Sequence, residues 1–445
     1  MKKLTLPSNS PMTKSTFLYG VATASFQIEG AAESRLPCIW DTFCEQEGKI
    51  ADNSDGKVAC DHFNHWREDV DLIESFGVDA YRLSISWPRV MTKDNQLNQA
   101  GIQFYIDLLD ELKARNIKVF VTLYHWDLPQ HFEDQGGWLN RETAYHFQKY
   151  VDVVSQALGD RVYSYATFNE PFCAAFLGYE VGIHAPGIAT RKAGRQATHH
   201  ILLAHGLGMK MLNKNSPNTL NGIVLNFTPC YPRTDSDADV KATDYADQYL
   251  NQWYIQPLME GSYPAIFNEL PEDDRPDIHD GDLSIISCSI DFIGINYYTR
   301  LTYSAPKEAD EFFFEHAHLE PRTDIGWEIF PQALVDLLTN LNERYSLPPI
   351  YITENGAAMA DKLENGEVND IDRIDYYNQH LNAVHKAITA GVNVKGYFAW
   401  SLMDNFEWAE GYLKRFGLTY VNYDTQERIV KSSGQAYKAL LAARK

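Results

Sequence analysis

Residues 101–126, GIQFYIDLLDELKARNIKVFVTLYHW, join an amphipathic helical pattern at 101–115 to a short β-branched and aromatic run at 118–126. This order predicts a helix followed by a strand. Comparable apolar runs, most followed by a longer amphipathic stretch, recur eight times, at 17–24, 80–87, 118–126, 163–169, 222–227, 291–298, 349–353 and 394–400. Further helical patterns lie between them, among them 66–76, 142–158 and 376–390.

Strands that alternate with helices predict a parallel sheet, and eight such units are enough to close a barrel. We therefore predict the α/β class and a single (β/α)8 TIM barrel over residues 1–445, with residues 1–14 as a flexible N-terminal segment. No Pro-, Ser- or Gly-rich linker divides the chain. Long segments after the predicted strands should form the active-site mouth, at about 28–60, 172–198, 229–250, 301–326 and 403–417.

The charge balance limits the class of partner. The chain has 60 acidic and 39 basic residues, for a formal net charge of −21. Such a surface argues against nucleic acid or an anionic membrane as the main partner. No stretch approaches the roughly 18 consecutive apolar residues that a membrane span requires. The first residues, MKKLTLPSNSPM, have no apolar run behind their lysines, so we expect no signal peptide and a cytoplasmic location.

Metal and cofactor motifs are missing from the sequence. The six cysteines show no CxxC spacing, which is typical of reduced thiols in a cytosolic protein. His62, His65, His199 and His200 lack the HExxH spacing of a zinc enzyme, and neither GxGxxG nor GxxxxGK[ST] occurs. We therefore expect neither a metal nor a cofactor.

Polar and aromatic residues stand where most predicted strands end. They are Arg82, His125, Trp126, Asn169, Glu170, Asn226, Asn296, Tyr297, Tyr298, Glu354, Asn355 and Trp400. In a closed barrel these ends meet at one mouth, and a ring of buried polar groups indicates a site for a polar ligand. The 13% aromatic content suits stacking on sugars, although on composition alone a large core is the better explanation.

Two glutamates form the candidate catalytic pair. Glu170 ends the fourth run in TFNEP (167–171), and Glu354 ends the seventh in YITENG (351–356). Strands four and seven lie nearly opposite in an eight-strand ring, so both side chains can face one sugar. Retaining glycosidases need an acid/base and a nucleophile, and we assign these roles to Glu170 and Glu354. Either glutamate alone is better explained as a turn residue or helix cap, and only the pair at two strand ends favours catalysis.

Neighbouring residues divide the labour of this pair. Asn169 is placed to hold the sugar 2-hydroxyl, while Arg82 and Tyr298 are donors that favour an ionised Glu354. A nearby Glu354 anion should raise the pKa of Glu170, so that Glu170 starts protonated. Esterification of Glu354 removes that charge, and the pKa of Glu170 should then fall so that it acts as a base.

Segments from residue 17 to the end of the chain resemble signatures of glycoside hydrolase family one, the β-glucosidase family, in the order in which that family carries them. They are FLYGVATASFQIEGA (17–31), CIWDTF (38–43), YRLSISWPR (81–89), TLYHWDLP (122–129), TFNEP (167–171), GIHAPG (182–187), DFIGINYY (291–298), YITENG (351–356) and GYFAWSLMDNFEW (396–408). One departure is that Phe172 and Cys173 follow NEP where many members carry a Trp.

The resemblance implies roles at matching positions. Gln27, His125, Asn169 and Glu407 are similar to the family's sugar-binding set, with Trp408 also reaching the sugar hydroxyls. Trp400 resembles the platform under the sugar ring, and Trp327 the wall on the aglycone side. Arg82 and Tyr298 match the supports of the nucleophile. The expected substrate-binding residues also include Trp126, Asn296, Tyr298 and Phe416.

The eighth loop bears on the substrate. The family's phospho-glycosidase branch carries a Ser, a Lys and a Tyr that grip a 6-phosphate, whereas NFEWAEGYLKRFG (405–417) has Glu407 and Phe416 at two of these positions. Only Lys414 fits, and an anionic Glu407 would repel a phosphate dianion. The resemblance therefore implies an unphosphorylated substrate. A 6-phospho-β-glucosidase and a catalytically inactive sugar-binding barrel are the alternatives.

The expected activity is hydrolysis of terminal β-D-glucosyl residues from β-glucosides and cello-oligosaccharides by double displacement. Because Glu407 and Gln27 can reach both epimers at O4, we also expect side activity on β-galactosides and β-fucosides. Family members range from monomers to larger assemblies, so the sequence leaves a homo-oligomer open.

Overall fold

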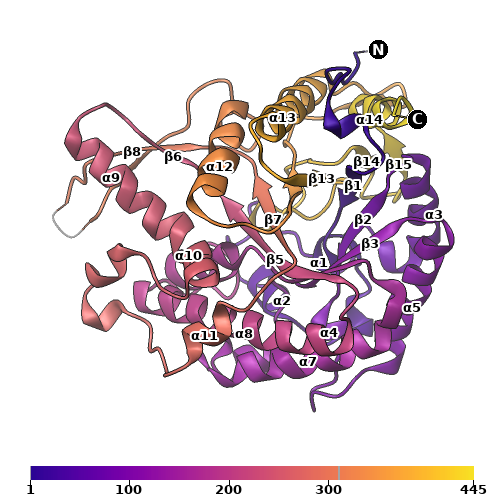
Figure 1. Ribbon diagram of the computed structural model, residues 1–445. Coiled ribbons are helices and arrows are strands. Elements are labelled where there is room, and N and C mark those ends of the chain that lie inside the picture. Colours follow the sequence, from indigo (N-terminus) through magenta and orange to yellow (C-terminus); the bar gives the residue numbers. More distant parts are fainter. Residues whose placement is uncertain (1, 309–310, 445) are drawn as a thin grey trace.

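The computed structural model describes residues 2–308 and 311–444. Parallel strands close into a barrel in the order of the sequence (Figure 1). Their bounds are β1 (Leu18–Ala22), β2 (Ala80–Ser84), β3 (Lys118–Tyr124), β4 (Ser164–Asn169), β5 (Leu220–Phe227), β7 (Phe292–Tyr297), β10 (Ile350–Asn355) and β13 (Val394–Trp400). Each of the eight predicted runs coincides with one of these strands, so the predicted (β/α)8 barrel is confirmed.

Barrel closure joins the two strands that lie furthest apart in the sequence. All of β1 pairs in parallel with β13, from Leu18 opposite Gly396 to Ala22 opposite Trp400. The other edge of β1 pairs with β2. Every strand of the ring therefore has two neighbours, and the carboxyl ends of all the strands open on the same side.

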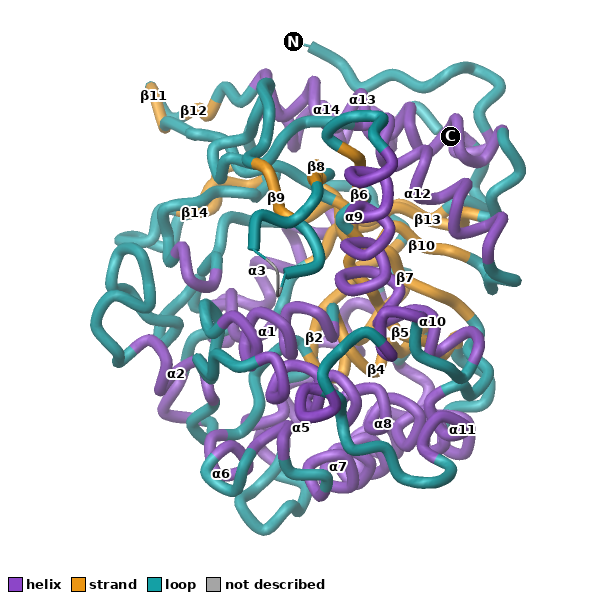
Figure 2. Tube along the Cα trace, turned by 90° about the vertical axis from the view of Figure 1, so that its left-hand side faces the viewer, coloured by secondary structure: helices purple, strands orange, loops and turns teal. Residues whose placement is uncertain are grey.

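Helices surround the ring of strands (Figures 1 and 2). The longer ones are α3 (His62–Ser75), α5 (Gln99–Ala114), α7 (Glu142–Leu158), α8 (Arg191–Asn215), α9 (Asp237–Asp247), α10 (Trp253–Glu260), α12 (Pro331–Arg344), α13 (Ile371–Thr389) and α14 (Ser432–Ala442). Shorter helices are α1 (Ser25–Ile28), α2 (Ile39–Cys44), α4 (Trp87–Val90), α6 (Gln130–Glu133) and α11 (Asp282–Ile286). Within the described residues, no helix is long and apolar enough to cross a membrane.

Sequence periodicity explains how these elements pack. On α5, Ile102, Tyr105, Leu109 and Leu112 recur at helical spacing and are buried, and Asn98 caps the helix by accepting a hydrogen bond from the Gly101 N–H. On the strands, alternate residues face opposite sides of the ring. Consequently, the side chains on one face of each strand fill the barrel, and those on the other face pack against the helices.

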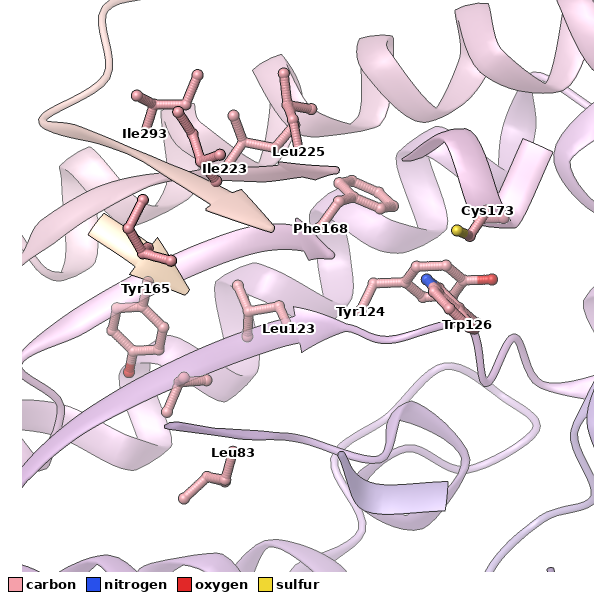
Figure 3. Packing of buried hydrophobic residues seen from close by; sticks show 14 of the residues in the cluster. Leu83, Leu123, Tyr124, Trp126, Tyr165, Phe168, Cys173, Ile223, Leu225 and Ile293 are labelled. Carbon is pink, nitrogen blue, oxygen red and sulfur yellow. The ribbon is translucent and has the colours of Figure 1, made fainter. Parts of the chain in front are cut away.

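Two apolar layers follow from that alternation. Inside the barrel, the Phe120 ring lies 4.8 Å from Phe398 and 5.4 Å from Tyr351, measured between ring centroids. Outside it, Leu123 and Leu225 belong to the large core between strands and helices, part of which Figure 3 shows. The interior is therefore a packed core beneath the mouth and not a pore.

Three small sheets in the described part of the chain lie in segments that follow the barrel strands. β6 (Cys230–Pro232), β8 (Leu301–Ser304) and β9 (Phe314–His316) form one sheet beside α9. β11 (Leu363–Glu364) pairs with β12 (Glu367–Val368), and β14 (Thr419–Val421) pairs with β15 (Arg428–Val430). These additions fall in the long segments after the barrel strands.

The N-terminal residues lie along α13. The Thr5 N–H donates to Asn378 Oδ1 at 3.0 Å, and Asn382 Nδ2 donates to the Thr5 carbonyl at 3.1 Å. Leu4 and Met12 are buried. The flexibility expected for residues 1–14 stays a prediction, as does the single-domain organisation of residues 1–445, and Met1 lies outside the described residues.

A buried network of charges fixes the loops after β10 and β13. Lys431 Nζ lies 2.6 Å from Asp404 and 2.5 Å from Asp361, and all three side chains are at most 1% exposed. Arg415 also pairs with Asp404, and Arg373 with Asp361, each at 2.7 Å. A buried charge is costly unless it is paired, so these contacts hold the loops in one arrangement.

Candidate active site

The predicted nucleophile Glu354 is the penultimate residue of β10, and both of its oxygens accept hydrogen bonds. Arg82 Nη1, from β2, donates to Glu354 Oε1 at 2.6 Å. The Tyr298 hydroxyl donates to Glu354 Oε2 at 2.7 Å. Arg82 and Glu354 are both buried, at 2% and 3% exposed. Two donors on different strand ends therefore fix the orientation of this carboxylate.

Glu170 follows β4 and is also buried. Asn296 Nδ2 donates to Glu170 Oε1 at 2.6 Å, and the Cys173 thiol donates to Oε2 at 3.1 Å. Burial, followed by the negative charge of Glu354, raises the pKa of Glu170 to about 8, against the opposing effect of the two hydrogen bonds. Glu170 therefore keeps its proton near neutral pH, as general acid catalysis requires.

The backbone at Glu170 adopts the left-handed region, with φ of +49°. This conformation is unfavourable for a residue with a side chain and persists only where the surroundings hold it. The Glu170 N–H donates to the Val224 carbonyl on β5 at 2.9 Å, which ties the residue to the neighbouring strand. The turn directs the chain away from the barrel immediately after the strand.

Asn169 links the two glutamates. Its Oδ1 accepts from Arg82 Nη2 at 2.7 Å and from Asn296 Nδ2 at 3.0 Å. Arg82 and Asn296 are in turn the donors to Glu354 and Glu170. A continuous set of hydrogen bonds therefore runs from one carboxyl group to the other.

Two residues predicted to bind substrate use polar atoms within the protein. Trp126 Nε1 donates to the Asn169 carbonyl at 2.9 Å. The Asn296 amide donates to Glu170 and Asn169, and its Oδ1 accepts from the Thr353 hydroxyl at 2.7 Å. These contacts suit orientation of the site, so direct substrate binding by Trp126 and Asn296 stays a prediction.

Other predicted sugar-binding residues keep polar atoms free of protein partners. Gln27 Nε2 donates to Asn405 Oδ1 and to the Phe406 carbonyl, at 2.9 and 2.8 Å. Within the described residues, Gln27 Oε1, Glu407 Oε2 and His125 Nδ1 are buried without a hydrogen-bond partner. Because unpaired buried polar atoms are costly, their presence indicates a site for a ligand rich in hydroxyl groups.

Ionisation distinguishes these free groups. Burial, followed by the charges of Glu354 and Glu170, raises the pKa of Glu407 to about 8, so the anionic form expected from the sequence is disfavoured near neutral pH. Burial and the nearby Arg82 lower the pKa of His125 well below its ordinary value, so the imidazole is neutral. His125 Nε2 lies 3.1 Å from Asn169 Nδ2, an arrangement in which Nε2 accepts and Nδ1 carries the proton.

Aromatic rings line the sugar side of this set. The His125 ring stacks on Trp400 and Trp408, with centroids 5.9 and 6.0 Å apart. Trp126 packs on Trp408 at 4.4 Å. Trp400 and Trp408 are almost fully buried, at 3% and 4% exposed. Flat faces of this kind suit contact with the C–H face of a sugar.

Trp327 and Phe416 lie on the side of the nucleophile. The Tyr298 ring is 5.4 Å from Trp327 and 6.0 Å from Phe416. Phe416 is buried, whereas Trp327 is half-buried. Lys414, in the same loop as Phe416, donates to the carbonyl and carboxylate of Asp324 at 2.8 and 3.1 Å. This lysine is therefore engaged by protein groups.

Cys173 is a residue of the site whose contact was not foreseen. The sequence marks Cys173 only as a departure from the family pattern after NEP, and not as a partner of Glu170. The available signal was its spacing, because a residue three positions further on in a helical turn can reach back to its predecessor. Asn405, which holds Gln27, was also missed, and no spacing relates residues so far apart.

A separate cavity lies away from these residues. It has a volume of about 520 Å³ and lies between the end of β5, α9 and α12, where Phe227, Asp247 and Leu337 line it. Its lining includes no predicted site residue. Among the described residues, no group of three or more His, Cys, Asp or Glu side chains could hold a metal ion.

The site holds two buried glutamates at the carboxyl ends of nearly opposite strands. Hydrogen-bond donors join them, and tryptophans and unpaired polar atoms flank them. This arrangement is that of a glycoside hydrolase. The family profile of "Glycosyl hydrolase family 1" matches residues 10–445. The chain belongs to this family, as the resemblance of its motifs implied, and is an enzyme.

Named relatives support this assignment. The chain is 48% identical over 431 residues to a "Beta-glucosidase" of Agrobacterium sp. (strain ATCC 21400), covering 95% of this chain and 94% of that protein. It is 42% identical over 456 residues to a "Bifunctional beta-D-glucosidase/beta-D-fucosidase" of Bifidobacterium breve, with coverage of 96% and 97%.

Solved structures agree in fold. The AHE enzyme from Alicyclobacillus herbarius superimposes with a TM-score of 0.95 at 44% identity, covering 100% of this chain and 99% of the other. Virulence factor SghA from Agrobacterium tumefaciens, solved with its substrate analog salicin, gives a TM-score of 0.94 at 47% identity, and the match covers 97% of each chain.

Proposed function

We propose that the chain is a retaining β-glucosidase that removes terminal non-reducing β-D-glucosyl residues from β-glucosides and cello-oligosaccharides. One observation carries the proposal: two buried glutamates have opposite environments. Glu354 accepts from Arg82 and Tyr298 at 2.6 and 2.7 Å, while burial and the charge of Glu354 raise the pKa of Glu170 to about 8. One group is prepared as an anion and the other as an acid.

In the first step, a Glu354 oxygen attacks the anomeric carbon as the bond to the leaving oxygen breaks. Glu170 gives its proton to that oxygen, and the aglycone departs as an alcohol. Glu354 then carries a glucosyl ester and no charge. Because this charge was one cause of the raised pKa of Glu170, the acid becomes a base that takes a proton from water in the second step.

The glucosyl group is held by the atoms that lack protein partners. Gln27 Oε1, Glu407 Oε2 and His125 Nδ1 supply acceptor and donor groups for sugar hydroxyls. We assign Trp400 as the platform under the ring and Trp408 as a further contact. Asn169, between the glutamates, is placed to hold the 2-hydroxyl, a contact that strengthens in the transition state.

The substrate we propose is unphosphorylated. Lys414, the remaining candidate for gripping a phosphate, is engaged by Asp324. A phosphate dianion would also lie beside Glu407, whose pKa is raised first by burial and then by the charges of Glu354 and Glu170. Adding negative charge there is unfavourable. We keep 6-phospho-β-glucosidase as the second candidate, because Lys414 matches that branch.

Activity on β-fucosides and β-galactosides is part of the proposal. Gln27 and Glu407 each offer an oxygen acceptor, and acceptors can serve an axial or an equatorial 4-hydroxyl. The bifunctional β-glucosidase/β-fucosidase from Bifidobacterium breve is a relative whose name combines activity on β-glucosides with activity on β-fucosides. A panel of nitrophenyl glycosides with cellobiose and a 6-phosphoglucoside tests the range, and strict preference for glucosides would refute the side activity.

The roles of the glutamates are tested by two variants. Glu354→Ala should lose hydrolysis, and added azide should then yield an α-glycosyl azide because it attacks from the face of the missing carboxylate. A β-azide, or undiminished hydrolysis, would overturn the assignment of the nucleophile. Glu170→Ala should spare substrates with good leaving groups in the first step, and equal loss for all leaving groups would contradict its role as an acid. An inactive sugar-binding barrel would hydrolyse none of these substrates.

We also propose a cytoplasmic location, with small β-glucosides as partners and no role for nucleic acid or membrane. The net charge of −21 and the six free cysteines support this setting. Fractionation of the source cells tests the location. Light scattering of the purified protein decides between a monomer and a homo-oligomer.

A further inference from the structure

We propose that Cys173 is a positioning residue whose thiol, held against Oε2 of Glu170, sets how readily that oxygen gives up and takes back the catalytic proton. The inference rests on the proposed function, in which Glu170 is the acid/base. It concerns a side chain that follows the catalytic motif and that none of the roles assigned above requires.

Cys173 is the first residue of the π-helix η5 (Cys173–Val181), directly after the turn that contains Glu170. Its backbone N–H donates to the Glu170 carbonyl at 2.9 Å, and its Sγ lies 3.1 Å from Glu170 Oε2. Figure 3 shows Cys173 beyond the carboxyl ends of β3 and β4, near Trp126. The backbone N–H and the thiol of Cys173 therefore both hold Cys173 against Glu170.

The two oxygens of Glu170 have unequal donors. Asn296 Nδ2 lies 2.6 Å from Oε1, and its amide cannot turn over, because its Oδ1 accepts from Thr353 and its Nδ2 also serves Asn169. An amide N–H is a stronger donor than a thiol. In a neutral carboxyl group the carbonyl oxygen is the better acceptor, so the amide selects Oε1 as the carbonyl and leaves the proton on Oε2.

A thiol is suited to the other oxygen because its hydrogen bond can be switched. When Glu170 is ionised, the S–H donates to Oε2; when Oε2 is protonated, the S–H turns away and sulfur is a weak acceptor. Burial, followed by the charge of Glu170, raises the pKa of Cys173 well above its ordinary value, so the thiol keeps its own proton. A hydroxyl at this position would stabilise the carboxylate more strongly.

Charged or titratable groups from five other elements lie near Glu170 or its neighbour Asn169. They are Glu354 on β10, Arg82 on β2, His125 after β3, Tyr298 after β7 and Glu407 after β13. Among the residues that the structure describes, these groups make no hydrogen bond to Oε2, which Cys173 alone supplies. Replacing Cys173 therefore changes the contact at one oxygen and leaves the surrounding charges in place.

The experiment compares Cys173→Ser and Cys173→Ala with wild type in the pH dependence of kcat/KM, on an aryl glucoside with a poor leaving group. The basic limb of this profile reports the ionisation of the free enzyme's acid. Cys173→Ser should move the limb to lower pH by about 0.5 to 1, since the hydroxyl favours the carboxylate. Cys173→Ala removes the donor and should move it to higher pH. Cys288→Ser, outside the site, is the matched control and should leave the limb unchanged.

Opposite movements separate this role from a structural one, because damage to packing lowers kcat/KM at every pH without moving the limb. Limbs that do not move, or that move in the same direction, would overturn the inference. If Cys173→Ser does not fold, the direction of movement in Cys173→Ala decides. Glu170→Ala distinguishes failure of the proposed function from failure of the role of Cys173. If Glu170→Ala retains the wild-type basic limb, the assignment of Glu170 as the acid fails. If Glu170→Ala loses that limb but the limbs of the Cys173 variants do not move, only the role of Cys173 is rejected.

Discussion

The charge of Glu354 should control the acidity of Glu170, and Glu354→Gln tests this coupling. The substitution removes one negative charge while keeping the shape of the side chain. Burial is the first cause of the raised pKa of Glu170, and the Glu354 charge is the second. Loss of that charge favours the ionised form of Glu170, so its pKa should fall toward, but not reach, the ordinary value.

The magnitude follows from Coulomb's law. Retaining glycosidases hold their two carboxyl groups about 5–5.5 Å apart. With an effective dielectric constant of about 20, two unit charges at this separation interact by about 3 kcal/mol. Since about 1.4 kcal/mol corresponds to a tenfold change, the proton dissociation constant of Glu170 should increase by about 100-fold.

Carbon-13 NMR of carboxyl-labelled glutamate measures this ionisation without any need for turnover. The Glu170 signal is assigned by its loss in Glu170→Gln on the same background. Glu328→Gln is the control, because Glu328 is another buried glutamate and its charge is paired with Arg300. A dissociation constant that changes less than about threefold in Glu354→Gln would refute the coupling and leave burial as the whole cause.

Three further results are expected. Lys431→Met should lower the free energy of unfolding by about 3–5 kcal/mol in denaturant titrations, because it leaves buried carboxylates unpaired, whereas Lys113→Met, in an exposed pair, should change it by less than about 1 kcal/mol. Gly356→Ala should greatly reduce the yield of folded protein, since a Cβ there would lie 1.7 Å from the Trp400 carbonyl oxygen; wild-type yield would contradict this packing. Glu170, with a folded pKa of about 8 against an ordinary 4.5, contributes stability that is complete below pH 4.5 and lost as pH rises through 8. The free energy of unfolding of Glu170→Gln should therefore fall less across that range than that of the wild type. Identical curves of unfolding free energy against pH would count against the raised pKa.

The fold was predictable because it depends on local patterns. Strand positions followed from short apolar runs such as 118–126, and α5 followed from the spacing of Leu109 and Leu112. The placement of Glu170 and Glu354 around one mouth was predictable from their positions at the ends of strands four and seven, while their catalytic roles stay a prediction. Both levels use information carried by neighbouring residues or by the order of repeated units.

Contacts between distant segments were not predictable in the same way. Lys431 meets Asp404 and Asp361, and no periodicity relates these positions. The protein partners of Trp126 and Asn296 could not be predicted either: Trp126 donates to the Asn169 carbonyl and Asn296 donates to Glu170, while their expected contact with substrate stays a prediction. Which atoms of a side chain remain free depends on every neighbour at once, and a sequence pattern records only the type of residue.

Pairing of β1 with β13 also determines how late in translation the barrel can close. At about 5–20 residues per second, roughly 20–75 s separate the translation of β1 from that of β13. Throughout that interval one edge of β1 has no partner, and open strand edges promote aggregation. A ribosome that stalls before residue 394 therefore releases a chain with two open edges and without the loop that carries Glu407. Such a fragment lacks proposed substrate-binding residues and keeps open strand edges, so nearly the whole chain must be translated before the barrel can close.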